Sequence, residues 1–261
     1  MKPPVLTFLA ALGAVLLLGA PQPLAADPAK VIVFAAASLR EAFEAAQPAF
    51  ARQTGMAVTF NFGGSDALEQ QLVQGASADV FASANQTQMK RAADGGLLDS
   101  PATIFAHNRL VAIVAKARAA DLHGLADLAK PGVKVVLADA TVPVGAYART
   151  ALHALDGRKG FDPAFDTLVE KNVVSEELDV KAVATKVSLG EADAGIVYAT
   201  DVAPIASSVQ SYPFPSEVAP DISYPIATLK AAPNAAGAKA FVDFITHEGQ
   251  TYLRARGFLP P

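Results

Sequence analysis

Residues 31–51 read VIVFAAASLREAFEAAQPAFA, and this stretch decides the fold class. Its first part, residues 31–36, is an apolar run with the length of a strand that is buried on both faces. From residue 39 to 51 the apolar residues recur every three or four positions, which predicts an amphipathic helix. A buried strand that leads directly into a helix begins a β-α-β unit, so we expect a mostly parallel sheet with helices on its faces.

The same alternation of strand-like and helix-like segments continues to the C-terminus. We expect strands at 58–62, 79–83, 109–115, 133–138, 194–198, 209–214 and 222–229, and helices at 66–73, 86–93, 144–155, 163–170, 180–189, 235–246 and 249–256. No internal repeat and no flexible linker divides the chain. Two α/β units without a linker predict two lobes joined by crossing strands, with the last helices packed on the first lobe.

The N-terminal segment has the features of a secretory signal peptide. Lys2 precedes an apolar run that is shorter than the roughly 20 residues of a membrane-spanning helix, and small residues follow at Ala25 and Ala26. We therefore expect cleavage after Ala26 rather than a retained membrane anchor. The expected division is a signal peptide at 1–26, lobe I at 27–108 and 209–261, and lobe II at 109–208.

Composition excludes several kinds of function. The formal net charge is −4 at pH 7, no basic run is present, and a nucleic-acid partner is therefore not expected. The chain has no cysteine, which rules out disulfides, thiolate metal sites and a lipid anchor on cysteine. Its four histidines lie far apart without a metal-binding spacing, and we interpret them as surface or capping residues.

Two serines lie where a strand passes into a helix. Ser38 follows the first strand, and Ser38-x-x-Glu41 matches a capping box, so its structural interpretation is a helix cap. Ser65 follows two glycines in NFGGSDA (61–67), which favour a tight turn. Free amides and the positive end of a helix dipole favour an anion at such places. We expect Asp66 to face solvent or the helix amides, because an inward carboxylate would repel a dianion.

Three further stretches offer hydrogen-bond donors at the same kind of place. Pro143 is typical of a first helical turn, which leaves the amide of Val144 without a helical acceptor. Val180 begins another helix and offers its amide, and Tyr198 ends a buried strand, where its hydroxyl needs a partner. Each position taken alone also has a structural interpretation, as a helix start or as a core tyrosine bonded to a carbonyl.

Taken together, these stretches resemble the periplasmic molybdate-binding proteins of ABC uptake systems. The resemblance covers nearly the whole chain after residue 26. It is carried, in order and spacing, by VFAAASL (33–39), GASADVFASA (75–84), VPVGAYA (142–148), DV (179–180) and GEADAGIVY (190–198). It implies a two-lobed periplasmic-binding-protein fold of type II, with a mostly parallel sheet flanked by helices in each lobe, that closes on one tetrahedral oxyanion.

The resemblance also implies a function and a site. The positions that match the family's oxyanion ligands are Ser38, Ser65, Val144, Val180 and Tyr198. Val144 departs from the alanine expected in many members, but the contact there is a backbone amide. The implied cargo is molybdate, and also tungstate, with molybdenum present only as the bound oxyanion. The chain is then no enzyme, needs no cofactor, and is a periplasmic monomer that delivers its anion to an ABC permease.

Uncharged hydrogen-bond donors are sufficient to bind a doubly charged oxyanion. About seven N–H and O–H groups, each contributing about 1.5–3 kcal/mol to a charged acceptor, can hold a dianion without lysine or arginine. A site made only of donors also discriminates between anions, because a ligand oxygen that carries a proton needs a hydrogen-bond acceptor in the site. Phosphate at neutral pH partly keeps such a proton, whereas molybdate and sulfate do not.

Three alternatives remain open at this stage. Sulfate or another tetrahedral oxyanion shares the shape and charge of molybdate. A serine hydrolase is suggested because GGSDA (63–67) approaches the G-x-S-x-G nucleophile motif, with Ser65 as nucleophile and His247 as the available base. An organic solute such as an amino acid usually requires an arginine for its carboxylate, and only Arg40 lies in the five stretches.

Overall fold

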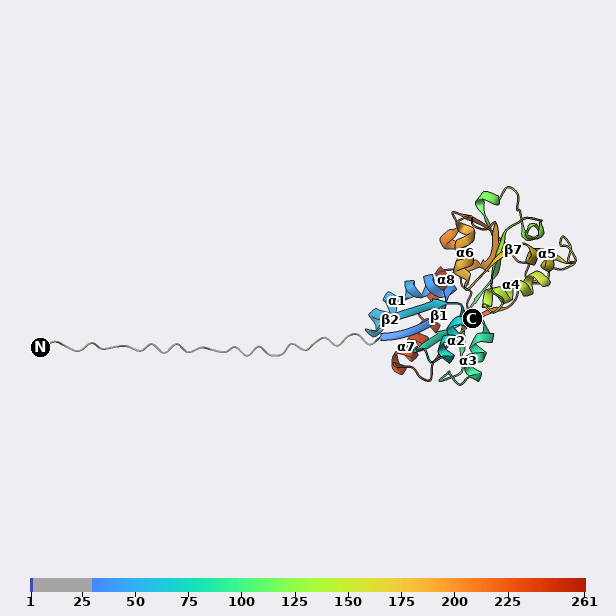
Figure 1. The fold of residues 1–261 in the computed structure, drawn as a ribbon. Helices are drawn as coiled ribbons and strands as arrows, with labels where there is room; N and C mark the ends of the chain where they lie inside the picture. Colours follow the sequence, from blue (N-terminus) through green and yellow to red (C-terminus); the bar gives the residue numbers. More distant parts are fainter. Residues whose placement is uncertain (2–29) are drawn as a thin grey trace.

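Two five-stranded sheets, each with helices against it, form the two lobes of the chain in the computed structural model (Figure 1). The structure describes Met1 and residues 30–261, so the predicted signal peptide lies outside the described residues except for Met1. Within this described part, no helix has both the length and the hydropathy needed to cross a bilayer. The predicted two-lobed α/β fold is confirmed.

The sheet of lobe I has the strand order β2-β1-β3-β10-β4. Its strands are β1 (Lys30–Ala36), β2 (Ala57–Gly63), β3 (Val80–Ala82), β4 (Thr103–Asn108) and β10 (Ile222–Thr228). Strand β1 pairs in parallel with β2 and β3, whereas β10 runs antiparallel to β3 and β4. Four of its strands run in one direction and β10 runs against them, so the predicted mostly parallel sheet is a mixed sheet with two parallel and two antiparallel strand pairs.

Helices from both ends of the chain pack on lobe I. They are α1 (Arg40–Thr54), α2 (Ser65–Val73), α3 (Gln86–Asp94), α7 (Ala235–Thr246) and α8 (Gln250–Ala255), with the 3-10 turn η1 (Ala37–Leu39) before α1. Phe241 of α7 meets Phe43 and Phe50 of α1 edge to face, with ring centroids 5.6 and 5.4 Å apart. The C-terminal helices thus share the core of lobe I, as predicted.

Asp79 lies in GASADVFASA (75–84), one of the stretches that carry the resemblance, and its role is structural. Its carboxylate is fully buried and accepts hydrogen bonds from the amide of Ile32 at 2.7 Å and from the amide of Asn234 at 2.6 Å. Asn234 caps α7, so Asp79 ties the first strand to the C-terminal part of the chain.

The sheet of lobe II has the order β7-β6-β8-β5-β9. Its strands are β5 (Leu110–Ala115), β6 (Val135–Ala138), β7 (Val173–Glu177), β8 (Ala194–Tyr198) and β9 (Val209–Pro213). Its helices are α4 (Pro143–His153), α5 (Phe165–Lys171) and α6 (Val180–Ser188), with 3-10 turns η2 (Lys116–Arg118), η3 (Leu125–Ala129), η4 (Ala199–Asp201) and η5 (Ala203–Ile205). Here β5 is the reversed strand, since it is antiparallel to β8 and β9.

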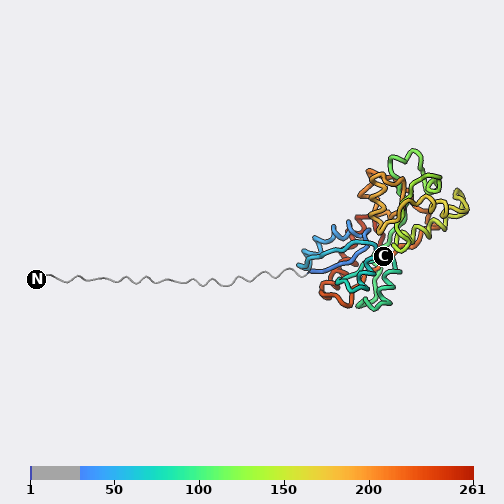
Figure 2. The backbone as a smooth tube through the Cα atoms, viewed as in Figure 1, coloured from blue at the N-terminus to red at the C-terminus, as the bar shows by residue number. Residues whose placement is uncertain are grey.

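The chain crosses between the lobes twice. It passes from β4 to β5 at Arg109 and returns between β9 and β10, so the first and last segments share one lobe (Figure 2). Because β9 pairs with β5, the boundary that we expected at residue 209 is wrong, and strand pairing places it after Pro213. The sequence of β9 does not show that it pairs with β5. Most of its residues are exposed, and an exposed strand shows little preference for one partner strand over another.

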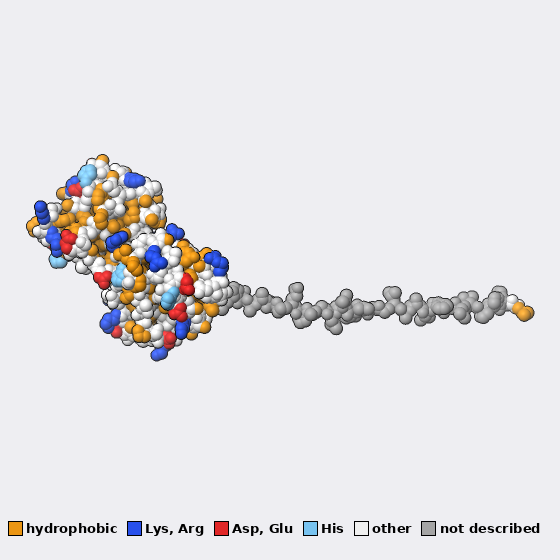
Figure 3. Space-filling view, turned by 180° about the vertical axis from the view of Figure 1, so that it is seen from behind, with side chains coloured by type: hydrophobic (Ala, Val, Ile, Leu, Met, Phe, Trp, Pro, Cys, Tyr) orange, Lys and Arg blue, Asp and Glu red, His pale blue; other side chains and the backbone are white. Residues whose placement is uncertain are grey.

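Two strands were not predicted, β4 and β7, and both lie at a sheet edge. Each has a short apolar part and polar residues, so neither shows the continuous apolar run of a central strand. On the face shown in Figure 3, charged side chains of both signs are spread over both lobes without a concentrated basic area.

Candidate functional site

The five predicted site residues line one cavity between the lobes. Ser38 and Ser65 come from lobe I, and Val144, Val180 and Tyr198 come from lobe II. Each lies at a helix start or at the end of a strand. This is the place where α/β sheets present ligand-binding groups, because the carboxyl ends of their parallel strands meet there.

The cavity is small and its lining carries no cation. Its volume of about 10 Å³ is room for roughly one water-sized sphere, far below the roughly 300 Å³ typical of sites for organic ligands. No lysine, arginine or histidine of the described chain lines it. Arg40 lies outside, over the ring of Phe62 at 4.5 Å. The amino-acid alternative therefore lacks both the space and the guanidinium that it requires.

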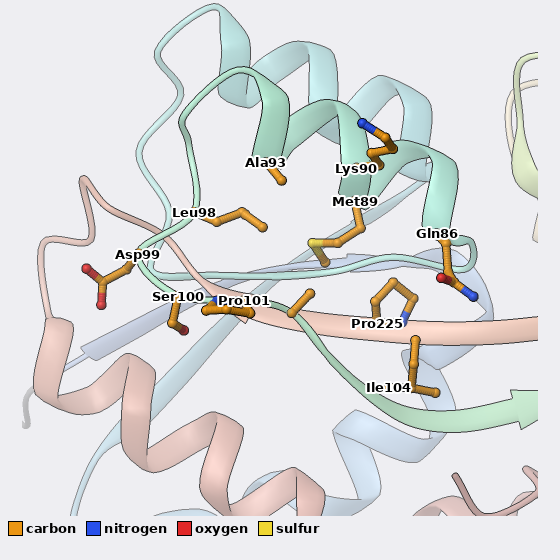
Figure 4. Close-up of a pocket in the computed structure, with 11 residues that line it drawn as sticks. Gln86, Met89, Lys90, Ala93, Leu98, Asp99, Ser100, Pro101, Ile104 and Pro225 are labelled. Atoms are coloured by element: carbon orange, nitrogen blue, oxygen red, sulfur yellow. The ribbon is translucent and has the colours of Figure 1, made fainter.

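A larger cavity, of about 530 Å³, lies in lobe I beside α3 and contains none of the five residues. Figure 4 shows Met89, Leu98 and Pro225 around it. Its lysine, Lys90, pairs with Asp94 at 2.7 Å. Its lining mixes apolar side chains with the polar residues Gln86, Asp99 and Ser100, and its size alone does not make it the better candidate.

Ser65 is placed to donate its hydroxyl hydrogen into the small cavity. It is the first residue of α2, it is buried, and its Oγ accepts a hydrogen bond from the amide of Ala84 at 3.0 Å. No histidine contacts it, because the Nδ1 of His247 lies 2.7 Å from the carbonyl oxygen of Asp243, outside the cavity. The nucleophile interpretation therefore lacks its base.

The capping-box interpretation of Ser38 is wrong. Helix α1 begins at Arg40 without a side-chain cap, and Ser38 lies one turn earlier, in η1. Its buried hydroxyl instead lies 3.0 Å from that of Tyr224. Glu41, the expected second member of the box, pairs with Lys181 at 2.7 Å. The 3-10 turn moves Ser38 out of the cap position and into the cavity wall.

Two helix starts in lobe II present backbone amides. In α4 the first helical bond runs from Ala146 to the carbonyl of Val142 at 3.0 Å, so the amide of Val144 has no helical acceptor. A Cβ on Gly145 would clash with the carbonyl oxygen of Asp139, which explains why a glycine stands where α4 approaches β6. In α6 the first residue is Val180, whose amide is equally without a helical acceptor.

Asp179 is the one acid among the described residues that line the cavity, and one of its carboxylate oxygens caps a helix. It caps α6 by accepting from the amide of Ala182 at 3.0 Å. This bond fixes the start of the helix and with it the position of the Val180 amide.

Tyr198 carries an unsatisfied donor into the cavity. The residue is fully buried, and its hydroxyl makes no well-formed hydrogen bond among the described residues, although it lies near the hydroxyl of Tyr224. Burial raises the pKa of Tyr198 well above its ordinary value, so the hydroxyl keeps its proton and remains a donor. A buried polar group without a partner costs about 1–3 kcal/mol, which marks this hydroxyl as a place for a ligand's acceptor.

The expectation for Asp66 is wrong. Its side chain is buried rather than solvent-facing, and its Oδ2 lies 3.1 Å from the hydroxyl of Thr141 in lobe II. It does not line the cavity. The approach of the other lobe covers Asp66, which the sequence of α2 alone does not show.

Contacts beside the cavity hold the lobes together. Besides the pair of Asp66 and Thr141, the side-chain amide of Gln88 donates to the carbonyl of Thr141 at 3.2 Å. Lys181 of lobe II reaches Glu41 of lobe I at 2.7 Å. The structure therefore shows the lobes close together around the five residues.

Comparison with known proteins decides the family. The family model of bacterial extracellular solute-binding proteins matches residues 31–259. The chain belongs to this family. A relative, the molybdate-binding protein ModA of Mycobacterium tuberculosis, is 40% identical over 233 residues, which are 88% of this chain and 85% of ModA.

Solved structures agree with this membership. The substrate-binding domain of a putative molybdenum ABC transporter from Clostridium difficile is 30% identical, with a TM-score of 0.65, over 89% of this chain and 99% of that one. The periplasmic molybdate-binding protein of Azotobacter vinelandii has a TM-score of 0.76 over 88% of this chain and 99% of that one. At 23% identity the latter shows the shared fold alone.

Membership in the solute-binding family separates the remaining alternatives. Its members bind solutes, so this chain is a binding protein rather than an enzyme, and its ligand is a bound solute rather than a cofactor.

Sequence reasoning missed two residues near the cavity, Tyr224 and Lys181. Tyr224 stands in an apolar strand, where a tyrosine hydroxyl needs a partner, so a signal was present. Lys181 follows Val180 directly, but its partners Glu41 and Asp201 are distant in sequence. Only the fold could reveal that pairing.

Proposed function

We propose that this solute-binding protein captures molybdate, and also tungstate, in the cavity between its lobes and delivers it to an ABC permease. The observation that carries the proposal is the unsatisfied, buried hydroxyl of Tyr198 in a cavity lined by further donors and no cation. The names of the relatives, molybdate-binding in Mycobacterium tuberculosis and molybdenum transport in Clostridium difficile, supply the choice of anion.

The proposed contacts are all uncharged. The hydroxyls of Ser38, Ser65 and Tyr198, the amides of the two serines and the amides of Val144 and Val180 make about seven donors for four oxygens. At about 1.5–3 kcal/mol each, they contribute on the order of 10–20 kcal/mol before desolvation of the anion and closure of the lobes are subtracted. A micromolar dissociation constant needs only about 8 kcal/mol to remain.

The cavity bears on the size and the charge of the ligand. It has room for roughly one water-sized sphere and none for an organic solute, so even a tetrahedral oxyanion requires the lining residues to move apart slightly. Because the other groups that face the cavity are donors and Oδ1 of Asp179 is held by its helix cap, an anion that carries no proton is favoured. Sulfate meets these conditions as well as molybdate, so the experiment must separate the two.

Isothermal titration of the purified protein with molybdate, tungstate, sulfate and phosphate tests the proposal. We expect a dissociation constant for molybdate in the micromolar range or below, and much weaker binding of phosphate. Tight binding of phosphate, or no binding of any of the four anions, would overturn it. A preference for sulfate would keep the site and correct the cargo.

Two substitutions test the site within the same titration. Ser38→Ala and Ser65→Ala should each weaken molybdate binding by more than about tenfold, the loss of one charge-assisted hydrogen bond. Ser77→Ala, at an exposed serine of lobe I outside the cavity, is the matched control and should bind as the parent does. Unchanged affinity in both site variants would show that the anion binds elsewhere.

A further inference from the structure

Tyr224 is a fully buried residue behind the cavity, and its hydroxyl is held in one place. It lies on β10 at a point where the pairing with β4 shifts register, between Tyr224 and Pro225. Its ring packs edge to face against Phe258 at 5.4 Å and against Tyr198 at 6.0 Å. The ring contacts leave the hydroxyl 3.0 Å from Ser38 Oγ.

Asn108 favours one direction for the hydrogen bond between Tyr224 and Ser38. Its Oδ1 accepts from the backbone amide of Arg109 at 2.8 Å, which sets the orientation of the side-chain amide. Its Nδ2 then donates to the hydroxyl of Thr200 at 2.9 Å and to the hydroxyl oxygen of Tyr224 at 3.2 Å. Asn108 ends β4 and Thr200 lies in η4, so this buried network also joins the lobes at their first crossing.

The direction of these bonds determines what Ser38 can do. Because the oxygen of Tyr224 already accepts from Asn108, the arrangement in which Tyr224 donates its hydrogen to Ser38 Oγ is favoured. In that arrangement Ser38 directs its own hydrogen toward the cavity that it lines. Ser65 has the same arrangement with a different donor, since its Oγ accepts from the backbone amide of Ala84.

We infer that Tyr224, oriented by Asn108, is a positioning residue that makes the Ser38 hydroxyl a fixed donor and thereby sets the preference of the site for oxyanions without a proton. The inference rests on the proposed function, because it concerns the same cavity. Tyr224 does not line the cavity, so it acts on the anion through Ser38.

If Tyr224 positions Ser38 in this way, removing the Tyr224 hydroxyl should affect molybdate and hydrogen phosphate differently. With Tyr224 in place, one of the two lone pairs of Ser38 Oγ is occupied and its hydrogen is directed into the cavity, so the hydroxyl meets a ligand as a donor. Without the Tyr224 hydroxyl, Ser38 can rotate and accept the proton of hydrogen phosphate. Molybdate has no proton to offer, so it only loses the fixed orientation of one donor.

Tyr224→Phe tests the inference because it keeps the ring packing and removes only the hydroxyl. We expect molybdate to bind about 3- to 10-fold more weakly, a part of one charge-assisted hydrogen bond. Phosphate should bind as before or more tightly, so the ratio of the two affinities falls. Tyr212→Phe is the control, because that hydroxyl donates to the carbonyl of Leu122 at 3.0 Å, away from the cavity.

A double-mutant cycle separates positioning from general damage. In a Ser38→Ala background, Tyr224→Phe should have no further effect on molybdate affinity. Equal weakening of molybdate and phosphate, or an undiminished effect in the Ser38→Ala background, would overturn the inference. If the parent protein binds molybdate, such a result leaves the proposed function intact, and if the parent binds no oxyanion, the proposed function itself has failed.

Discussion

At the scale of single residues, a substitution of Tyr198 should affect anion binding and protein stability differently. Removing a buried hydroxyl that lacks a partner should not destabilise the protein, whereas removing a donor to a dianion should weaken binding. We therefore expect Tyr198→Phe to bind molybdate more than about tenfold less tightly while its anion-free melting temperature stays the same or rises. Titration and thermal unfolding measure both quantities, and a lowered melting temperature with unchanged affinity would contradict the assignment.

The Tyr198 hydroxyl also leads to a prediction of how the affinity for molybdate depends on pH. Binding requires the protonated hydroxyl, and burial raises the pKa of Tyr198 well above the ordinary value of about 10. The donor is lost only as the pH rises through that elevated pKa. The affinity for molybdate should therefore be constant between about pH 7 and 9.5, measured by titration at several pH values. A decline with a midpoint inside this range would show that a group with a lower pKa controls binding.

At the scale of helices and strands, the sequence predicts regular elements well and local turns poorly. The central strands and most helices follow from apolar runs and helical spacing, because burial imposes those patterns. The strands β4 and β7 were missed because an edge strand needs no continuous apolar run. The 3-10 turn before α1 was missed because a capping box and a short turn share the same residues.

An ion pair between α1 and α6 belongs to the same scale. Lys181 reaches Glu41 at 2.7 Å and the fully buried Asp201 at 2.9 Å. Burial alone lowers the pKa of Lys181, but the facing carboxylates of Asp201 and Glu41 outweigh it, so the pKa is raised. The ammonium group near the cavity is thus already paired with two carboxylates and is not needed by the anion.

Glu41→Gln tests whether this ion pair supports the closed arrangement. Losing an interlobe partner should weaken molybdate binding a few-fold, less than the loss of a direct donor, because the pair is partly exposed. The matched control is Glu44→Gln on the same helix, whose exposed pair with Arg40 lies within lobe I and should leave the affinity unchanged. Equal affinities for both variants in titration would assign no role in closure to Glu41.

At the scale of the whole molecule, the sequence placed the five site residues together but not their surroundings. Each of the five stands at a strand or helix end, and α/β sheets bring such ends to one edge. The partner of β9, the cover over Asp66 and the hydroxyl of Tyr224 behind Ser38 all depend on how distant segments pack. No local pattern in a single sequence shows which distant segments pack together.

The two lobes approach each other closely at Gly64. A Cβ there would lie 2.6 Å from the carbonyl oxygen of Leu178 in the other lobe, so Gly64→Ala should hold the lobes apart. We expect weaker molybdate binding and a larger radius of gyration by X-ray scattering at saturating molybdate. Gly63→Ala is the control, since its Cβ would meet only Leu68, at 3.6 Å or more. An unchanged radius and affinity in Gly64→Ala would show that this approach is not required.

We propose that uncharged donors from both lobes surround an oxyanion without a cation. A crystal structure of the molybdate complex measures this directly. We expect the molybdate oxygens within hydrogen-bonding distance of Ser38, Ser65, Val144, Val180 and Tyr198, with the Nζ of Lys181 still paired to Glu41 and Asp201. An anion bound to a lysine or arginine, or bound outside this cavity, would contradict the claim.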